Sequence, residues 1–571
     1  MTPTLAIANE QINDLPLLMG ILDDMGIAKT IDSIVKPHGH WRGVSVGTLT
    51  SLWLCHMLQE HDHRMVTVRE WAEQRAQTIQ DMLGMPLRTT DCTDDRLANV
   101  LSMLGNVETQ QKLDCLLVNG WIQAYELPVE RVRLDSTSVS VYHKPDDPKS
   151  LLQLGHSKDH RPDLRQYKIM MASLDTLGMP ICAQIVPGNR ADDGLYVPAY
   201  EAATKVLCKR DLLYVGDGKM GSLKTRGHLA SHGSRYLCAF RAPCLTERDM
   251  SQWLDEAFAN QQEWDIYESL DISTGELVRD ADIYSFQRSQ TWVDAAALQG
   301  HDWSERVVMV RTLSAQRGAF HRLQTKMERL CKALEALREP PKRGRKRYTS
   351  ESELAAVISE MVAKADLTGI IGVSLQEETL SDGKTRWTVG SVSSNYLKWG
   401  ALIARSGWLV YLSNTTPEQY SVQQLVGHYR NQIIQEHGFS RLKTRNLQIR
   451  PVFVRDEERI AGLVWLLTLA LRVLTLIEYR IREELAKRKE TLIGLNPGSP
   501  TQATGVPTTE RILSAFKNIT QTSIEAGEVL IRNVTSLTRL QQQILQLLRL
   551  PDDLYSRLAR EPTNWQRNLR E

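Results

Sequence analysis

The sequence predicts an α/β protein built on a mixed sheet, with helical N- and C-terminal regions. Two observations support this class. The residue pattern changes from helical to extended at Val129. Beyond that point, strands and helices follow in the order β-β-β-α-β-α-β, in which antiparallel strands lead through helical crossovers to parallel ones. A chain of 571 residues is too long for one ordinary hydrophobic core, so we expect three or four domains.

The N-terminal 125 residues show the apolar periodicity of helices. An acidic first turn at Asp94 and Asp95 marks one helix start. The predicted helices are Ile7–Met19, Leu22–Ile34, Val44–Gln59, Val66–Ala76, Thr93–Leu104 and Val107–Ala124.

The next segment predicts the sheet. An antiparallel meander is expected from three extended runs joined by polar or turn segments. A short, continuously apolar run ending at Asp217 is typical of a parallel strand buried on both faces. The predicted strands are Val132–Tyr142, Gln166–Asp175, Ile181–Pro187, Leu212–Asp217 and Arg235–Arg241, with helices at Leu195–Lys209 and Ser222–His232.

The remaining chain predicts an insertion followed by more of the sheet and its helices. The insertion contains a charged helix, a basic segment at 338–347 and two strand-like pieces. The predicted elements are Leu313–Leu337, Gly369–Gln376, Arg386–Val392, Gly407–Ser413, a helix over 417–443, an apolar helix over 455–487, a linker at Asn496–Pro507 and a helix at Ser536–Leu548. The expected domains are a helical domain at 1–125, a sheet domain in two parts at 126–243 and 406–490, an insertion domain at 244–405 between those parts, and a linker with a helical region at 491–571.

Composition narrows the class of protein. The 42% hydrophobic and 24% charged content is that of a soluble globular protein. The net charge of +1 neither supports nor excludes a polyanionic partner. Eight scattered cysteines without a CxxC pair predict buried reduced thiols and a cytoplasmic location. No signal peptide is predicted. Arg472 interrupts the apolar run Ile460–Ile477, which favours a core helix over a membrane span.

Three acidic residues stand in unusual places. Asp135 lies in the middle of a predicted strand, where a carboxylate is costly to bury. Asp217 ends a buried parallel strand, at the sheet edge where ligands bind in α/β proteins. Glu436 lies on a predicted helix between the apolar Ile433 and Phe439. Taken singly, Asp217 is better explained as a turn or capping residue, and Glu436 as a partly solvated glutamate on a helix face.

Together, the three carboxylates suit metal-dependent phosphodiester chemistry. Cleavage and strand transfer can be run by two metal ions roughly 3.5–4 Å apart. Hard cations such as Mg²⁺ take a few carboxylates and leave positions open for phosphate and water.

The helix around Glu436 resembles a family signature. Tyr429, Glu436 and Lys443 match the Y-x2-R-x3-E-x6-K spacing of the DDE transposases of bacterial insertion sequences. Gln432 stands at the Arg position of that signature, and the nearby Arg430 points to another helix face. The segments 155–164, 187–192 and 450–462 are also similar to the family, and the resemblance covers roughly residues 126–480.

The resemblance implies a ribonuclease-H-like catalytic core carrying an insertion domain. It makes Asp135, Asp217 and Glu436 the catalytic metal ligands for two Mg²⁺ ions, with Mn²⁺ as a substitute. It also implies that one tryptophan of the insertion stacks on a flipped base, with Trp264, Trp292, Trp303 and Trp387 as candidates. Basic clusters and the signature residues give the expected DNA contacts, which are Tyr429, Arg430, Gln432, Arg441, Lys443, Arg445, Lys158 and Arg161.

The sequence therefore predicts a transposase that cuts double-stranded DNA at transposon terminal inverted repeats and joins the ends to target DNA. Because two ends are held at once, a homodimer is expected. Two alternatives remain: a nuclease of the same fold without strand transfer, and an inactive domesticated DNA-binding protein. The N-terminal helices are predicted either to bind DNA ends or to serve packing or dimerisation.

Overall fold

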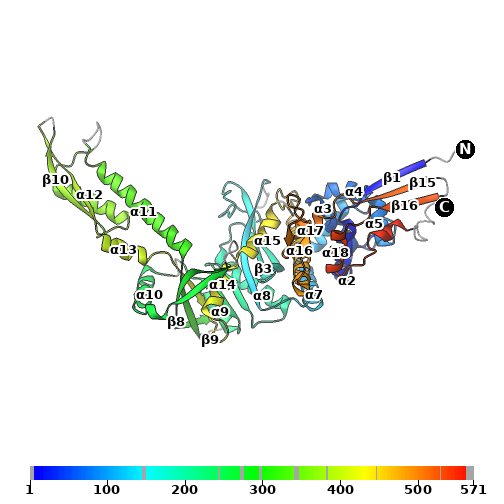
Figure 1. Ribbon diagram of the computed structural model, residues 1–571, viewed down its shortest axis with the longest axis horizontal. Coiled ribbons are helices and arrows are strands. Elements are labelled where there is room, and N and C mark those ends of the chain that lie inside the picture. The colour runs from blue at the N-terminus through cyan, green and yellow to red at the C-terminus, as the bar shows by residue number, and fades with distance from the viewer. Residues whose placement is uncertain are drawn as a thin grey trace. The chain divides into compact units, whose positions relative to one another are not determined.

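The structure, a computed structural model, divides into two compact units. The first contains Met1–Tyr236, Trp292–His301 and His428–Glu571, and the second contains Leu237–Thr291 and Asp302–Gly427. Figure 1 labels the elements of both units. The described residues are 5–143, 150–241, 245–270, 276–294, 299–339, 346–380, 383–444, 446–526 and 529–560.

The first unit begins with the predicted helical region. Its apolar faces form a core that includes Leu17, Trp53 and Leu101, each almost fully buried. The side chains of Ser45 and Asn106 accept hydrogen bonds from backbone N–H groups and cap two of the helices. The helices are α1 (Leu15–Asp24), α2 (Ile27–Ile34), α3 (Val46–Glu60), α4 (Met65–Glu73), α5 (Ala76–Leu83), α6 (Asp94–Gly105) and α7 (Val107–Ala124).

The predicted helix at Ile7–Met19 is wrong over its first half. Residues Leu5–Gln11 form strand β1, which pairs with β15 (Thr520–Ala526), and β15 pairs with β16 (Val529–Val534). The Glu10 carboxylate accepts hydrogen bonds from the backbone N–H groups of Gln77 and Thr78 at the start of α5. The strand's partner lies about five hundred residues further along the chain, so no local pattern announces it.

The predicted order of strands and helices between residues 126 and 243 is confirmed. Strand β2 (Arg131–Val141) pairs antiparallel with β3 (Arg165–Leu174), which pairs antiparallel with β4 (Met179–Pro187). On its other side β2 pairs parallel with β5 (Leu213–Gly216). The crossovers are α8 (Tyr196–Leu207) and α9 (Leu223–Ser231), and β6 (Arg235–Ala239) follows. The result is the predicted mixed α/β sheet with helices on its faces.

The helix predicted over 417–443 is two helices. α14 (Val422–Arg430) ends before Asn431, and α15 (Ile433–Lys443) begins after Gln432. Asparagine favours turns because its side chain competes for backbone hydrogen bonds. Tyr429 therefore lies on α14, whereas Glu436 and Lys443 share α15.

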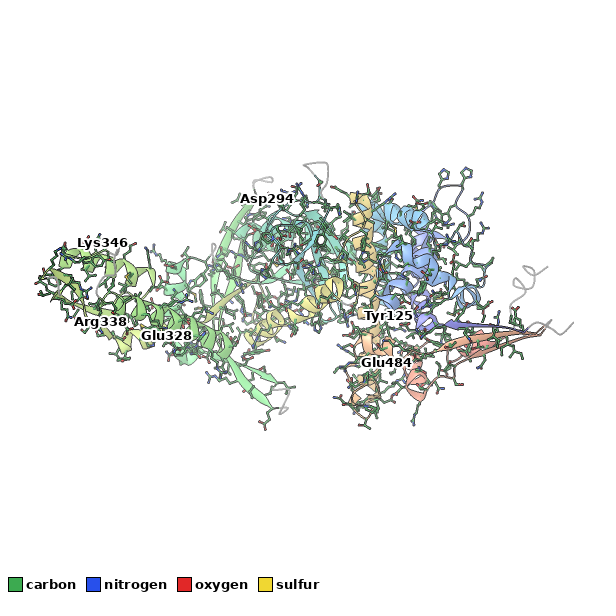
Figure 2. All side chains as sticks on the ribbon, turned by 90° about the horizontal axis from the view of Figure 1, so that it is seen from above. Tyr125, Asp294, Glu328, Arg338, Lys346 and Glu484 are labelled. Carbon is green, nitrogen blue, oxygen red and sulfur yellow. The ribbon has the colours of Figure 1, made fainter. Side chains whose placement is uncertain are left out.

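The apolar helix α16 (Glu457–Arg488) forms the centre of the first unit. It is long and apolar enough to cross a membrane, but its apolar window is entirely buried inside the fold. Arg472 is fully buried, and its Nη1 lies 2.8 Å from Oδ1 of Asp114 on α7. Further along, Arg480 lies over the ring of Tyr125, 4.6 Å from its centroid. Figure 2 labels this tyrosine, which follows the C-terminus of α7. The predicted core helix is confirmed.

The C-terminal part contains more strand than predicted. After α16 come the short β13 (Leu492–Ile493) and β14 (Ala503–Thr504), which pair with each other. Two helices, α17 (Thr509–Ser514) and α18 (Arg539–Leu547), flank the β15–β16 hairpin that completes the terminal sheet.

The second unit contains a long antiparallel meander that the sequence analysis missed. Strand β12 (Trp408–Ser413) pairs with β6 and with β9 (Gln299–Thr312), and β8 (Leu277–Asp294) and β7 (Asp265–Leu270) continue the order. Helix α10 (Glu247–Ala259) precedes the meander. Polar, exposed residues alternate along much of β7 and β8, so their apolar content is too low to signal a strand.

The rest of the second unit is a helical layer on a hairpin. α11 (Leu313–Glu335) and α12 (Glu351–Lys364) pack on β10 (Ile371–Thr379) and β11 (Thr385–Ser394) through a core around Leu334, Leu354 and Val389. α13 (Tyr396–Ala404) follows. The predicted helix and both strand pieces are confirmed. Most of the basic segment at 338–347 lies outside the described residues.

Candidate active site

Asp135 and Asp217 come together at the centre of the sheet. The parallel register of β2 and β5 pairs Leu134 with Gly216, the last residue of β5, so Asp135 and Asp217 are the residues that directly follow this pair. Residues at matching positions on adjacent strands project from the same face. The negative charge of Asp217 also acts on Asp135, whose pKa is raised mainly by burial and further by Asp217. The prediction that these aspartates share one site is supported by this geometry.

A lysine partly neutralises the pair. The Nζ of Lys158 lies 3.4 Å from Oδ1 of Asp135 and donates to the carbonyl and the hydroxyl of Ser136, at 2.5 and 2.9 Å. The backbone N–H of Lys158 donates to the Ser138 hydroxyl. The ammonium opposes the effect of burial on the Asp135 pKa. The Lys158 ammonium therefore partly balances the negative charge of the two carboxylates.

Asp217 is held by its own contacts. The hydroxyl of Tyr196, at the start of α8, donates to its Oδ1 at 2.5 Å, and the backbone N–H of Lys219 donates to the same oxygen at 2.8 Å. Tyr196 is buried, and its pKa is raised well above the usual value by burial and then by Asp217 and Asp135. Tyr196 therefore remains a hydrogen-bond donor at any ordinary pH. Tyr196 was not predicted as a site residue, because a tyrosine at a helix start carries no distinctive sequence signal.

Glu436 stands apart from the two aspartates. Its side chain is exposed near the start of α15, a helix that contacts β2. Ligand atoms of Asp135, Asp217 and Glu436 do not all lie within 4.8 Å of one another, although all three residues are described. The structure thus brings the aspartates together and leaves Glu436 on a neighbouring, solvent-facing helix.

The far end of α15 is tied to the loop that carries Lys158. The Nζ of Lys443 lies 2.7 Å from Oδ1 of Asp159, and Arg450 lies 3.2 Å from the other oxygen. Burial lowers the pKa of Lys443, and the positive charges of Arg450 and Lys158 lower it further. Asp159 and Arg450 lie in segments that resemble the family, 155–164 and 450–462, but neither is among the expected DNA contacts. These contacts connect the signature helix to the residue that pairs with Asp135.

The other predicted DNA contacts lie in varied surroundings. Arg441 is ion-paired with Glu478 and Glu510 and is largely buried. Arg161 is exposed and paired with Asp163 at 2.7 Å. In addition, Tyr429 is buried, Arg430 is half-buried, Gln432 is exposed, and Arg445 lies outside the described residues.

Three of the candidate tryptophans belong to packed clusters. Trp264 packs edge-on against Trp408 at 5.3 Å and donates to the Ala257 carbonyl. Trp387 packs against the core of the second unit. Trp292 lies over Gly227, where a Cβ would come within 2.4 Å of its Cγ. Trp303 is half-buried.

The aspartate pair has the chemistry of a divalent-cation site. Asp135 and Asp217 directly follow paired residues of β2 and β5, and the pKa of Asp135 is raised. Negative charge is therefore concentrated and partly desolvated at this pair. Oxygen ligands of this kind suit Mg²⁺ or Mn²⁺. In this structure the Lys158 ammonium supplies the positive charge beside Asp135.

Comparison with known proteins identifies the family of the chain. The family model "Transposase DDE domain" matches residues 130–473, and a domain of unknown function, DUF4277, matches residues 7–117. No match was found among curated proteins.

Two solved structures are similar to the chain. One is the cryo-EM structure of the piggyBac transposase synaptic complex with hairpin DNA, at 9% identity and a TM-score of 0.31, covering 88% of this chain and 79% of that chain. The other is the Mos1 transposase paired-end complex with left transposon end, at 15% identity and a TM-score of 0.14, covering 39% and 74%.

The family match spans more than half of the chain and contains both aspartates and Glu436. The chain therefore belongs to the transposase DDE domain family and is a DNA transposase, an enzyme that cleaves DNA and transfers its strands.

Proposed function

We propose that Asp135, Asp217 and Glu436 are the catalytic carboxylates of this transposase and that they bind two Mg²⁺ ions, which Mn²⁺ can replace. The observation that supports the proposal is the parallel pairing of β2 with β5 up to Leu134 and Gly216, the residues just before Asp135 and Asp217. The exposed position of Glu436 on α15 leaves its carboxylate accessible to metal and DNA. A two-metal site spans more space than a single ion, so its ligands need not form one tight group.

Each neighbouring residue has a definite task in this scheme. Tyr196 and the Lys219 N–H hold the Asp217 carboxylate in one orientation. Lys158 neutralises Asp135 and is free to turn to a DNA phosphate once another cation takes its place. Bound divalent ions supply activation of the attacking water or 3′-hydroxyl and stabilise the leaving oxygen. Because cleavage and joining are both in-line phosphoryl transfers, one site serves both.

The proposed substrate is double-stranded DNA with terminal inverted repeats, followed by target DNA. Tyr429, Arg430, Gln432, Arg441, Lys443, Arg445, Lys158 and Arg161 are the proposed phosphate contacts. For Arg441 and Lys443 this requires exchange of their present carboxylate partners for phosphate oxygens. The helices of residues 1–125 are proposed to bind the transposon ends.

The active complex is proposed to be a homodimer, since two ends are joined in one event. Sedimentation of the protein with end DNA measures this directly. A complex of two chains and two ends is expected, and one chain on one end would contradict it.

Substitution of Glu436 tests the least supported of the three ligands. Glu436→Gln is expected to abolish cleavage while leaving DNA affinity within about twofold, because the amide keeps the shape of the side chain but loses its charge. Glu108→Gln, at an exposed site on α7, is the matched control and is expected to cut normally. Normal cutting by Glu436→Gln would remove Glu436 from the catalytic set.

A further inference from the structure

Two histidines and a glutamate gather between the helices that flank β5. Glu201 comes from α8, and His228 and His232 come from α9 and its C-terminal cap. Within the described ranges, this is the only group of three or more His, Cys, Asp or Glu residues whose ligand atoms all lie within 4.8 Å of one another. His228 and His232 are four residues apart, so their side chains lie on the same helix face. None of the three belongs to the proposed catalytic set.

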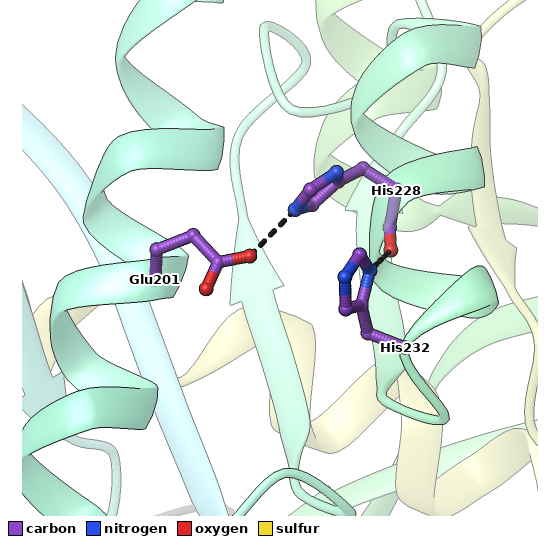
Figure 3. Close-up of side chains that lie close together, drawn as sticks. All are labelled: Glu201, His228 and His232. Carbon is purple, nitrogen blue, oxygen red and sulfur yellow. Dashed lines mark hydrogen bonds and ion pairs between the residues drawn. The ribbon is translucent and has the colours of Figure 1, made fainter. Parts of the chain in front are cut away.

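The contacts within the cluster orient both imidazoles. The Nε2 of His228 lies 2.7 Å from Oε1 of Glu201, and the Nδ1 of His232 lies 2.8 Å from the carbonyl oxygen of His228 (Figure 3). The ring centroids are 4.4 Å apart. A carbonyl partner requires Nδ1 of His232 to carry the proton, which leaves its Nε2 as a lone-pair donor. Metal-binding histidines are usually held in this way, through the nitrogen that does not bind the metal.

A simple hydrogen bond explains only part of this arrangement. It accounts for Glu201 and His228, but it gives no reason for a second imidazole to lie against the first with its Nε2 left available. The cluster is also open to solvent. The side chains of Glu201 and His228 are 42% and 19% exposed, and Glu201 lines an open hollow of about 760 Å³. An ion can therefore reach it.

We propose that Glu201, His228 and His232 bind one transition-metal ion of the Zn²⁺ class, with water as the fourth ligand. Two imidazoles and one carboxylate are a ligand set that Zn²⁺ prefers, whereas Mg²⁺ prefers oxygen ligands alone. Tetrahedral bonds of about 2.0–2.1 Å place ligand atoms roughly 3.3 Å apart. The cluster reaches this spacing by small side-chain movements, with the ion replacing the proton between Glu201 and His228.

The position of the site indicates a structural role. α8 leads into β5 and α9 follows it, so an ion shared by Glu201 and His228 links the two crossovers around the strand that directly precedes Asp217. Tyr196, which orients Asp217, begins the same α8. Trp292 packs against Gly227 and faces the His228 ring at 6.4 Å between centroids. Metal binding adds its free energy to the stability of this region.

Metal content and cobalt spectroscopy of the full chain test the proposal. The protein is stripped with a chelator, loaded with Zn²⁺ or Co²⁺ in excess Mg²⁺ to occupy the carboxylate pair, and then analysed for bound metal. The expected result is one Zn²⁺ per chain, a tetrahedral Co²⁺ absorption spectrum and a higher Tm with Zn²⁺. His232→Ala and Glu201→Gln are expected to weaken Zn²⁺ binding by at least about 100-fold.

Three comparisons make the outcome decisive. Glu201→Gln keeps a hydrogen-bond acceptor for His228, so unchanged Zn²⁺ affinity in this variant would overturn the proposal. His321→Ala removes an exposed histidine of α11 and is expected to bind Zn²⁺ normally. Asp135→Asn is also expected to retain the Zn²⁺. Binding lost in Asp135→Asn but kept in His232→Ala would assign the ion to the catalytic carboxylates instead and overturn the new site.

Discussion

At the scale of residues, the charge and orientation of Asp135 and Asp217 depend on neighbouring residues that belong to no sequence motif. Burial raises the pKa of Asp135, and Lys158 offsets that cost. Tyr196 fixes the orientation of Asp217. A carboxylate that is oriented in advance loses less entropy when it binds a cation, so in the proposed site these neighbours are expected to raise the metal affinity and the rate.

Removing the Tyr196 hydroxyl tests this support. Tyr196→Phe is expected to lower the cleavage rate about 10–100-fold and to raise the Mg²⁺ concentration needed for half-maximal rate, because Asp217 loses its donor. Titration of cleavage against Mg²⁺ measures both effects. Tyr200→Phe, whose hydroxyl contacts Ser234 instead, is the control. If both variants lose activity without a change in Mg²⁺ dependence, the hydroxyl of Tyr196 serves only packing.

His56 gives the first unit a calculable pH dependence. Burial lowers its pKa to about 4, and in the unfolded chain the pKa is about 6.5. The unfolded state therefore binds more protons between these values, and stability is lost as pH falls from 6.5 towards 4. The loss at pH 5 relative to pH 7 is at most about 2 kcal/mol from this group.

Unfolding at pH 7 and pH 5 checks the size of that contribution. His56→Gln is less stable at both pH values but is expected to show a smaller difference between them. His40→Gln, at an exposed position, is expected to keep the wild-type difference. A His56→Gln protein with the full wild-type pH dependence would show that the His56 side chain titrates normally in the folded state.

At the scale of elements, the close crossing of α6 and α16 depends on glycine. A Cβ at Gly462 would lie 2.1 Å from the Leu101 carbonyl oxygen, and one at Gly105 would lie 2.0 Å from the Glu458 carbonyl oxygen. Both neighbouring atoms belong to the backbone, so neither clash can be relieved by rotation of a side chain.

Alanine substitution at two helical glycines separates packing from helix propensity. Gly462→Ala is expected to destabilise the protein by about 1–3 kcal/mol or more, since the helices must move apart. Gly120→Ala, in α7 with no atom within 4 Å of the added Cβ, is expected to stabilise it by about 0.5–1 kcal/mol. Chemical denaturation measures both. Equal effects of the two substitutions would refute the close approach.

Elements whose apolar residues recur at a regular helical or strand spacing were predictable from the sequence. Strands that pair with partners far away in the sequence were not. Val107–Ala124 was predicted to the residue, since its apolar positions recur at helical spacing. Strand β1 was predicted as a helix because its partner β15 lies at the other end of the chain. The break at Asn431 was missed, because one turn residue does not interrupt a helical pattern strongly enough.

The residues of the candidate site were likewise predictable only in part. The places of Asp135 and Asp217 follow from strand order, which the sequence pattern conveys. Tyr196, Asp159 and Arg450 are brought in by tertiary contacts alone. The prediction that all cysteines are buried was wrong for Cys208, which is exposed where α8 ends.

At the scale of the whole molecule, one fold supports two phosphoryl-transfer steps. The first unit contains Asp135, Asp217 and Glu436, although the second unit interrupts it in sequence between β6 and α14. Strands β7, β8 and β9 and the helical layer of the second unit lie within the interval 244–405 that is predicted as an insertion. The central claim is that both DNA cleavage and joining depend on the carboxylate of Asp135.

The most direct measurement is cleavage and joining of a labelled duplex that carries the element's terminal repeat, with Mg²⁺ or Mn²⁺, by the wild type and by Asp135→Asn. The account predicts metal-dependent cut and joined products from the wild type, and a loss of both by at least about 1,000-fold in the variant with DNA binding retained. Cut or joined product from Asp135→Asn at the wild-type rate would contradict it.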